Sequence, residues 1–175
     1  MLVVVTGGSG SGKSAFAEDR VLSFGESRRI YIATMQAFDE ESHRRIRRHR
    51  RMRSGKGFET IERYTELDEL ILPKNCVVLL ECMSNLVANE LFCPQGSGEQ
   101  TEEAILRGVE RLVSGCAQVV IVTNELFSDG MQYDPSTEHY LRILGRINCR
   151  LAQMADRVYE VVAGIAIPWK GEKQE

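Results

Sequence analysis

The sequence has neither a long hydrophobic run nor a large excess of charge of one sign. Its long apolar runs, such as residues 77–80 and 119–122, are far shorter than the roughly 20 residues of a membrane-spanning helix, so we expect no membrane span. The 175 residues carry 22 Lys and Arg against 25 Asp and Glu, so affinity for nucleic acid would require a local basic patch. The first five residues are apolar and include no basic segment, which predicts a buried strand instead of a signal peptide, and hence a cytoplasmic protein.

Cysteine pairs are also missing. The sequence has five cysteines, an odd number, with no C-x-x-C pair and no histidine at metal-ligand spacing. This pattern argues against a disulfide framework and against a structural zinc site. We expect reduced thiols, mostly buried.

Short apolar runs alternate with segments of helical periodicity along the chain. This alternation predicts an α/β fold with helices on the faces of a mostly parallel sheet. The length fits one domain, which we place at residues 1–170, with a frayed tail at 171–175. The expected strands are residues 2–6, 29–34, 58–62, 77–81, 119–123, 157–163 and 165–168. The expected helices are residues 13–24, 39–53, 66–72, two segments around Leu86 and Leu106, and 137–155.

A glycine-rich segment lies between the first expected strand and the first expected helix. It reads Gly7-Gly8-Ser9-Gly10-Ser11-Gly12-Lys13-Ser14 and matches the phosphate-binding pattern G-x-x-x-x-G-K-[ST]. Glycines let successive amide N–H groups converge on phosphate oxygens, and the helix N-terminus adds a partial positive charge. Lys13 can reach the β- and γ-phosphates, and Ser14 is placed to bind magnesium. We therefore expect a site for GTP or ATP with Mg²⁺.

A carboxylate at the end of a neighbouring strand usually completes such a nucleotide site by holding the metal directly or through water. Glu81, which ends the apolar run 77–80, is the better candidate, because a charge there would be costly without a cation. Glu125, which follows the run 119–123, is the alternative. For Glu125 a helix cap or loop contact is an equally good interpretation.

Residues 44–53 contain seven arginines and His49. Three interpretations are open: a solvated basic face, a nucleic-acid footprint, and a nucleotide-phosphate site centred on His49. The lack of interleaved aromatics and the acidic remainder of the chain disfavour nucleic acid. In a helix, His49 shares one stripe with Arg45 and Arg53, and these cations favour a neutral imidazole that could attack phosphorus. The guanidiniums would stabilise the charge that develops in such a transfer.

Several short motifs occur in an order that is typical of one enzyme family. They are the phosphate loop, Tyr31-Ile32-Ala33-Thr34, Arg45-Ile46 with His49, Thr60 with Glu62, Leu79-Leu80-Glu81-Cys82, Asn89, Val122-Thr123-Asn124-Glu125, and Gly145-Arg146-Ile147-Asn148 with Ala155-Asp156. In these motifs the chain resembles bifunctional adenosylcobinamide kinase/adenosylcobinamide-phosphate guanylyltransferases, which assemble cobalamin. The resemblance covers nearly the whole length. Its most specific parts are the Arg-Ile-x-x-His element and the Leu-Leu-Glu-Cys strand.

The resemblance implies two reactions. The first phosphorylates the aminopropanol hydroxyl of adenosylcobinamide with a nucleoside triphosphate, GTP or ATP. The second transfers GMP from GTP to adenosylcobinamide phosphate through a guanylylated histidine, and His49 occupies that position. The family also implies a RecA-like P-loop NTPase fold, a three-layer sandwich, and assembly as a homotrimer.

The same resemblance assigns roles to individual residues. Lys13 and His49 are the implied catalytic residues, and Ser14 and Glu81 the implied metal ligands. Glu62 and Glu81 could also accept hydrogen bonds from the ribose or guanine. The implied nucleotide contacts are the phosphate loop Gly7 to Ser14, Ala33, Thr34, Met35, Arg50, Arg51, Met52, Arg53, Glu62 and Glu81.

Two other functions fit the same residues. One is a P-loop kinase or GTPase that lacks nucleotidyl transfer, in which His49 only contacts phosphate. The other is a nucleotide-switched module whose arginine-rich helix docks RNA or DNA. Covalent attachment of GMP separates the first alternative from the bifunctional enzyme, and salt-dependent binding to nucleic acid would identify the second.

Overall fold

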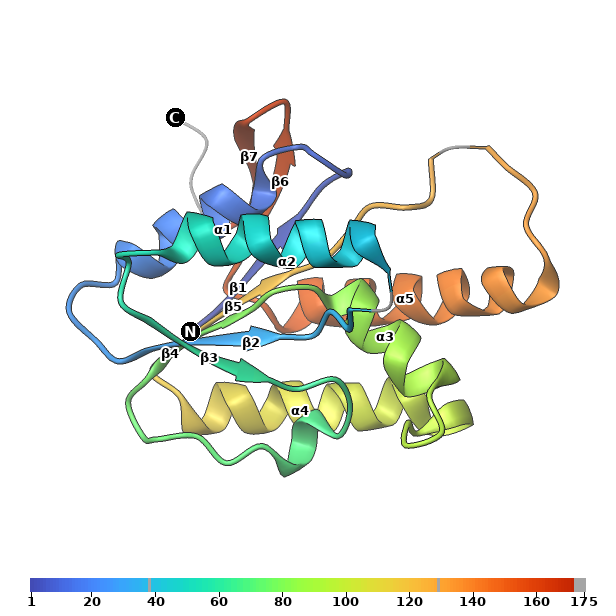
Figure 1. Ribbon diagram of the computed structural model, residues 1–175, viewed down its shortest axis with the longest axis horizontal. Helices are drawn as coiled ribbons and strands as arrows, with labels where there is room; N and C mark the ends of the chain where they lie inside the picture. Colours follow the sequence, from blue (N-terminus) through green and yellow to red (C-terminus); the bar gives the residue numbers. More distant parts are fainter. Residues whose placement is uncertain (38, 129, 172–175) are drawn as a thin grey trace.

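The computed structural model describes residues 1–37, 39–128 and 130–171. Its described strands form one sheet in the order β3-β2-β4-β5-β1-β6-β7 (Figure 1). The first six pair in parallel, and β7 pairs antiparallel with β6, which confirms the mostly parallel sheet. The strands are β1 (Leu2–Thr6), β2 (Arg29–Ala33), β3 (Phe58–Glu62), β4 (Val77–Leu80), β5 (Gln118–Val122), β6 (Arg157–Val162) and β7 (Ile165–Lys170).

Helices cover both faces of this sheet, which confirms the three-layer α/β sandwich. α1 and α2 lie together on one face, and α4 and α5 lie on the other (Figure 1). The helices are α1 (Lys13–Leu22), α2 (Glu40–Arg53), α3 (Met83–Phe92), α4 (Thr101–Gly115) and α5 (Pro135–Met154), with short 3-10 turns η1 (Leu67–Glu69) and η2 (Gly98–Gln100). Within the described ranges, none of the helices has the length and apolar character needed to cross a membrane. Of the predicted tail, only Gly171 lies within the described residues.

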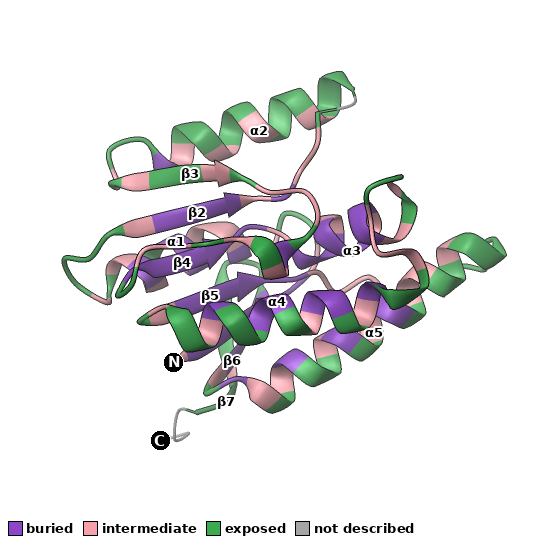
Figure 2. Ribbon diagram, turned by 90° about the horizontal axis from the view of Figure 1, so that it is seen from below, coloured by how far each residue is buried: buried purple, intermediate pink, exposed green. Residues whose placement is uncertain are grey.

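The hydrophobic core is divided by the sheet into two clusters. On β1, Leu2 and Val4 pack in the cluster that includes α3, α4 and α5, whereas Val3 and Val5 pack in the cluster that includes α1. Successive side chains of a strand point to opposite faces, so both faces of the central strands are buried (Figure 2). This explains why the central strands are continuous apolar runs in the sequence.

α2 lies on the surface and is held mainly by polar contacts. Of its residues only Arg53 is buried. Its N-cap is Asp39, whose carboxylate accepts a hydrogen bond from the amide of Ser42 at 2.7 Å. Two ion pairs within the helix, Glu41 with Arg45 at 2.6 Å and Glu40 with Arg47 at 2.9 Å, balance part of its positive charge.

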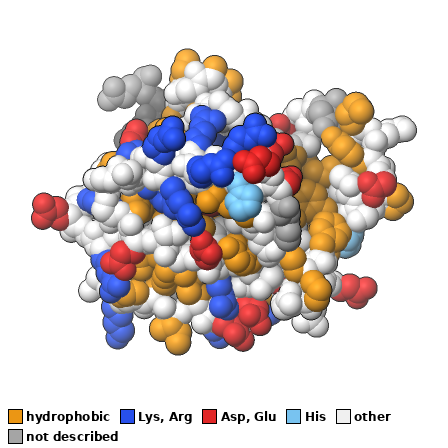
Figure 3. All heavy atoms as spheres, in the orientation of Figure 1, with side chains coloured by type: hydrophobic (Ala, Val, Ile, Leu, Met, Phe, Trp, Pro, Cys, Tyr) orange, Lys and Arg blue, Asp and Glu red, His pale blue; other side chains and the backbone are white. Residues whose placement is uncertain are grey.

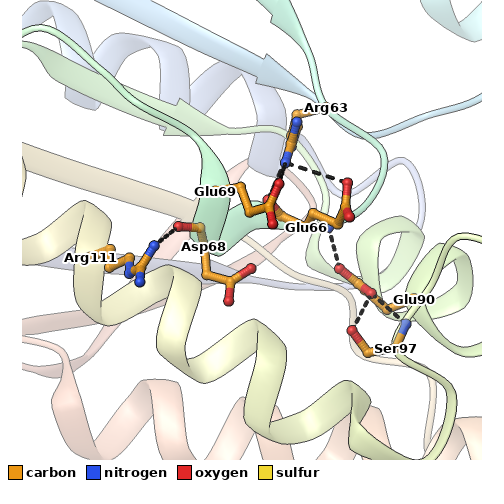
Figure 4. Close-up of polar contacts among 7 residues, drawn as sticks. All are labelled: Arg63, Glu66, Asp68, Glu69, Glu90, Ser97 and Arg111. Carbon is orange, nitrogen blue, oxygen red and sulfur yellow. Dashed lines mark hydrogen bonds and ion pairs between the residues drawn. The ribbon is translucent and has the colours of Figure 1, made fainter.

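The helix expected at residues 66–72 is wrong, because the segment contains only the single 3-10 turn η1. Side chains hold Glu66, which caps this turn, in a conformation that a helix cannot contain (Figure 4). Glu66 has a left-handed backbone with φ of 54°, and its amide donates to Glu90 Oε1 at 2.6 Å. Its carbonyl accepts a hydrogen bond from Arg63 Nε at 3.1 Å. Periodicity alone could not predict these competing partners.

The cysteines are less buried than the sequence led us to expect. All five are free thiols, but only Cys76 is buried, and Cys149 is exposed. The Cys76 and Cys116 sulfur atoms lie 3.5 Å apart at one end of the sheet. Burial, with the hydrogen bond to Cys76, raises the pKa of Cys116 to about 12, so this thiol stays protonated at neutral pH.

Candidate active site

The predicted phosphate loop connects β1 to α1 and lines a cavity of about 420 Å³. Residues 9–14 all face this cavity. Gly10 and Gly12 have φ of 72° and 95°, which side chains with a Cβ disfavour. Gly12 is the N-cap of α1, so the positive end of that helix dipole points at the cavity.

The turn between β6 and β7 supports the loop from behind. The amide of Gly164 donates to the carbonyl of Ser11 at 2.8 Å. A Cβ on Gly7 would lie 2.5 Å from the Val161 carbonyl oxygen, so only glycine fits there. The loop is thus shaped by its protein neighbours, which is the preorganisation that phosphate binding requires.

Lys13 is the cation of the loop. Its Nζ donates to the carbonyl of Gly8 at 2.8 Å, and its side chain is largely buried. Burial lowers the pKa of Lys13, and the nearby charge of Arg45 acts in the same direction. A buried ammonium group without an anion is unfavourable, so the site favours an anionic phosphate beside it.

His49 lies at the edge of the same cavity, on the side that α2 presents to the sheet. Its Nδ1 lies 2.7 Å from Glu81 Oε1 and 3.1 Å from the Tyr31 hydroxyl. The Glu81 side chain is 5% exposed, against 21% for His49. A carboxylate this close to Nδ1 favours the tautomer that carries its proton there, which leaves the lone pair on Nε2. Glu81 thus orients His49.

Tyr31 is the third member of this cluster. Burial first, and then the negative charge of Glu81, raise the pKa of Tyr31. The hydroxyl therefore stays protonated and is a hydrogen-bond donor for the carboxylate. The Arg53 guanidinium lies over the Tyr31 ring, 3.6 Å from its centroid, and completes the packing around the cluster.

A second, smaller hollow continues from the first along α2 and β3. Arg53 Nη2 donates to Thr60 Oγ1 at 3.1 Å, and Arg50 pairs with Glu62 at 3.2 Å along its wall. Met35, His49 and Glu81 line both hollows, so the two meet at the histidine. Figure 3 shows the Lys and Arg side chains gathered over the face that α2 occupies in Figure 1. A nucleotide could extend from the loop past His49 along this surface.

Most of the predicted contact residues surround the two hollows, but four do not line them. Gly7 and Gly8 shape the loop from behind, and Arg51 is exposed on α2. Thr34 is buried and joins two strand ends, because its Oγ1 donates to the Cys82 carbonyl at 2.8 Å. The predicted residues in the hollows are Ser9, Gly10, Ser11, Gly12, Lys13, Ser14, Ala33, Met35, His49, Arg50, Met52, Arg53, Glu62 and Glu81.

The two candidate carboxylates differ in their surroundings. Glu81 lines the nucleotide cavity together with Ser14. Glu125 instead accepts hydrogen bonds within its own loop, from the Phe127 amide at 2.9 Å and the Ser128 hydroxyl at 2.8 Å. The loop contact that the sequence left open for Glu125 is therefore the one observed.

The donor chemistry of the cavity fits Mg²⁺. A hydroxyl and a carboxylate are hard oxygen ligands, and Mg²⁺ in nucleotide sites takes few protein ligands beside phosphate oxygens and water. Residues 1–37, 39–128 and 130–171 contain no group of three or more His, Cys, Asp or Glu side chains that could hold a metal by themselves.

The cavity also contains Arg45, which the sequence analysis placed beside His49, and two residues to which it gave no individual role, Arg48 and Asn124. Asn124 follows β5, and its side-chain amide donates to Ser84 Oγ at 2.5 Å. Its position directly after a central apolar run was the available signal, because ligands of parallel sheets bind at the carboxyl ends of the strands.

The parallel sheet and the phosphate loop after β1 define a P-loop nucleotide-binding protein. Solved structures agree on the fold at low sequence identity. An ATPase from the type III secretion system of pathogenic bacteria matches with a TM-score of 0.54 and 13% identity, over 91% of this chain and 51% of that one. A DnaB-like replicative helicase matches with a TM-score of 0.51 and 12% identity, over 91% and 46%.

Sequence comparison then gives the family. Residues 3–169 match the model of the family described as cobinamide kinase / cobinamide phosphate guanyltransferase, and the chain belongs to that family. The bifunctional adenosylcobalamin biosynthesis protein CobU of Escherichia coli is 40% identical, over 97% of this chain and 100% of that protein. The CobP protein of Pseudomonas aeruginosa, described in the same words, is 31% identical over 97% of each. The resemblance stated from the motifs is thus confirmed.

Proposed function

We propose that this enzyme phosphorylates adenosylcobinamide with GTP or ATP and then guanylylates the product through a covalent intermediate on His49. The observation that carries the proposal is the contact of His49 with Glu81 at the point where the two hollows meet. Family membership supports both activities. The contact of His49 with Glu81 supports His49 as the nucleophile of guanylyl transfer, and not only as a contact to phosphate.

Guanylyl transfer takes two displacements in this proposal. The Nε2 lone pair of His49 attacks the α-phosphorus of GTP, an N–P bond forms, and the bond to the β-phosphate oxygen breaks to release pyrophosphate. The ring then carries a positive charge, which the Glu81 carboxylate 2.7 Å from Nδ1 compensates. A phosphate oxygen of adenosylcobinamide phosphate next attacks the same phosphorus, and the N–P bond breaks to restore His49.

The kinase step uses the phosphate loop. The aminopropanol hydroxyl of the substrate attacks the γ-phosphorus, the bond to the β-phosphate oxygen breaks, and the hydroxyl proton passes to water. Lys13 and the loop amides stabilise the charge on the transferred group. The hydroxyl of Ser14 would hold Mg²⁺ beside the phosphates, and this cation neutralises phosphate charge when bound. Glu81 is the second predicted metal ligand, but its contact with His49 favours the orienting role.

The guanosine is proposed to lie on the surface around the smaller hollow, whose enclosed volume of about 20 Å³ is too small to contain a base. Glu62 is an acceptor for hydroxyl or amino groups, and the stretch Arg50 to Arg53 lies beside it. The strand β2 ends at Ala33, and Thr34 and Met35 follow it. Thr34 acts in this proposal through the backbone it holds, and Arg51 only through its charge.

Incubation with α-labelled GTP tests the proposal. The wild-type protein should retain an acid-labile, base-stable label, and His49→Ala should retain none. His43→Ala is a matched control, since it changes an exposed histidine of the same helix. Full labelling of His49→Ala would refute the histidine assignment. Phosphorylation of adenosylcobinamide by a wild-type protein that never becomes labelled would favour the kinase-only alternative.

The homotrimer and the cytoplasmic location are also proposals. Light scattering of the purified protein should give three chains per particle, and cell fractionation should recover the enzyme with the cytoplasmic fraction. A single chain per particle would refute the trimer.

A further inference from the structure

A second large cavity lies beside the nucleotide site, between α5 and the loop that follows β5. It has a volume of about 720 Å³, which is in the range of about 300–1,000 Å³ typical of small-molecule sites. The loop runs out from the sheet and returns to the start of α5 (Figure 1). Figure 3 shows hydrophobic side chains gathered on this side of the molecule. We name the cavity between α5 and this loop the α5 cavity.

The walls of the α5 cavity are apolar and its charges are largely paired. Leu126 and Phe127 from the loop and Leu141 from α5 supply apolar surface. Charged side chains also line it, but Arg146 pairs with Glu102 at 2.6 Å, and Arg142 lies 3.9 Å from Glu138. The cavity therefore suits a large, mostly apolar ligand with polar groups at its periphery, and not a polyanion.

The α5 cavity adjoins the nucleotide site. Leu126 lines both cavities, and Asn124, two residues earlier, lines the nucleotide cavity. A ligand in the α5 cavity could therefore extend an arm past Leu126 toward the triphosphate. This is the geometry that transfer from a nucleotide to a bulky acceptor requires, because the reacting atoms must come within about 3–3.5 Å of each other.

We propose that the α5 cavity binds the corrin ring of the acceptor substrate, with its aminopropanol arm directed past Leu126 to the phosphate loop. This proposal rests on the proposed function, which supplies a corrinoid as the acceptor. The flat macrocycle packs on Phe127 and Leu141, and its amide side chains reach the paired arginines. One cavity then serves both reactions, since the ring stays in place while its arm first accepts phosphate and then GMP.

Gly145 gives independent support for a flat ligand on this helix. A glycine inside α5 weakens the helix by about 1 kcal/mol relative to alanine, so another factor must favour it. A Cβ there would have only ordinary contact with the Phe127 ring, at 3.7 Å, so packing within the protein does not require glycine. Because Gly145 has no side chain, nothing projects from this position of α5 into the space where the ring would lie.

Binding of adenosylcobinamide, measured by equilibrium dialysis with corrin absorbance, tests this inference. Gly145→Phe should fill the cavity and weaken binding at least tenfold, while labelling of His49 by GTP stays at the wild-type level. Gly145→Ala adds one methyl group to the same wall and should weaken binding by less than Gly145→Phe. Phe127→Ala should also weaken binding, whereas Ile71→Ala, which changes an apolar residue that is 92% exposed and outside this cavity, should not. If Gly145→Phe fails to fold, the comparison of Phe127→Ala with Ile71→Ala tests the inference.

Three results would overturn the inference. Wild-type affinity in a folded Gly145→Phe protein would exclude the α5 cavity while leaving the proposed function intact. A change in the number of chains per particle in that variant, with unchanged corrinoid affinity, would assign the cavity to a second copy of the chain. A wild-type protein that GTP labels but that does not bind adenosylcobinamide would refute the acceptor itself, and the inference with it.

Discussion

Replacing Glu81 by glutamine should slow the formation of the guanylyl-enzyme about 10- to 150-fold. The substitution keeps an oxygen that can accept a hydrogen bond from Nδ1–H. It removes the negative charge 2.7 Å from Nδ1, on a side chain that is only 5% exposed. A hydrogen bond to a charged group contributes about 1.5–3 kcal/mol, and each 1.36 kcal/mol changes a rate about tenfold. The ring becomes positive as the N–P bond forms, so this loss falls on the transition state.

The assay is the single-turnover rate of label transfer from α-labelled GTP to the protein, which is separated from free nucleotide under alkaline conditions that preserve the adduct. Measurement over a range of Mg²⁺ concentrations distinguishes the two roles of Glu81. If the carboxylate orients His49, saturating Mg²⁺ leaves the rate low, whereas a metal ligand would be compensated by more metal. Glu125→Gln is the matched control, because Glu125 bonds to its own loop. A wild-type rate in Glu81→Gln would refute the reasoning.

Three further predictions concern stability. Gly7→Ala should lower the free energy of unfolding by about 1–3 kcal/mol, because its Cβ would lie 2.5 Å from the Val161 carbonyl oxygen. Gly8→Ala should not lower it, because no atom lies within 4 Å of the added Cβ. Urea unfolding measures both variants. Lys13→Met should abolish nucleotide binding yet raise the melting temperature at neutral pH. Burial lowers the pKa of Lys13 below 10.5, so the penalty on the charged form disappears as pH rises through that lowered value, and the gain should shrink in melts at alkaline pH. Asp134→Ala should lower the melting temperature at neutral pH, because hydrogen bonds from Thr137 and Ser136 at the start of α5 lower the pKa of Asp134 below 3.8; the difference should vanish as pH falls through that lowered pKa. An unchanged difference at low pH would contradict the capping role.

The central strands could be predicted closely from the sequence. The runs at residues 77–80 and 119–122 are buried on both faces, so their apolar character follows directly from their position. The phosphate loop could be predicted too, because its glycines, lysine and serine are consecutive in the chain. The central strands and the phosphate loop could therefore be predicted because each depends on residues that are close together in the chain.

Contacts between distant segments could not be predicted in the same way. The orienting contact of Glu81 with His49 depends on how α2 lies over the sheet, and the role of Tyr31 depends on the same placement. The sequence offered Glu81 as a metal ligand, since a buried carboxylate requires a cationic partner and the motif suggested Mg²⁺. The helix at residues 66–72 failed for a related reason, since its backbone partners come from Arg63 and Glu90.

Mass spectrometry of the protein after exposure to GTP tests the central claim most directly. The account predicts one added GMP per chain, carried by the peptide that contains His49, and its loss on addition of adenosylcobinamide phosphate. A GMP adduct mapped to any other residue, or guanylyl transfer to the acceptor with no adduct at any time, would contradict it.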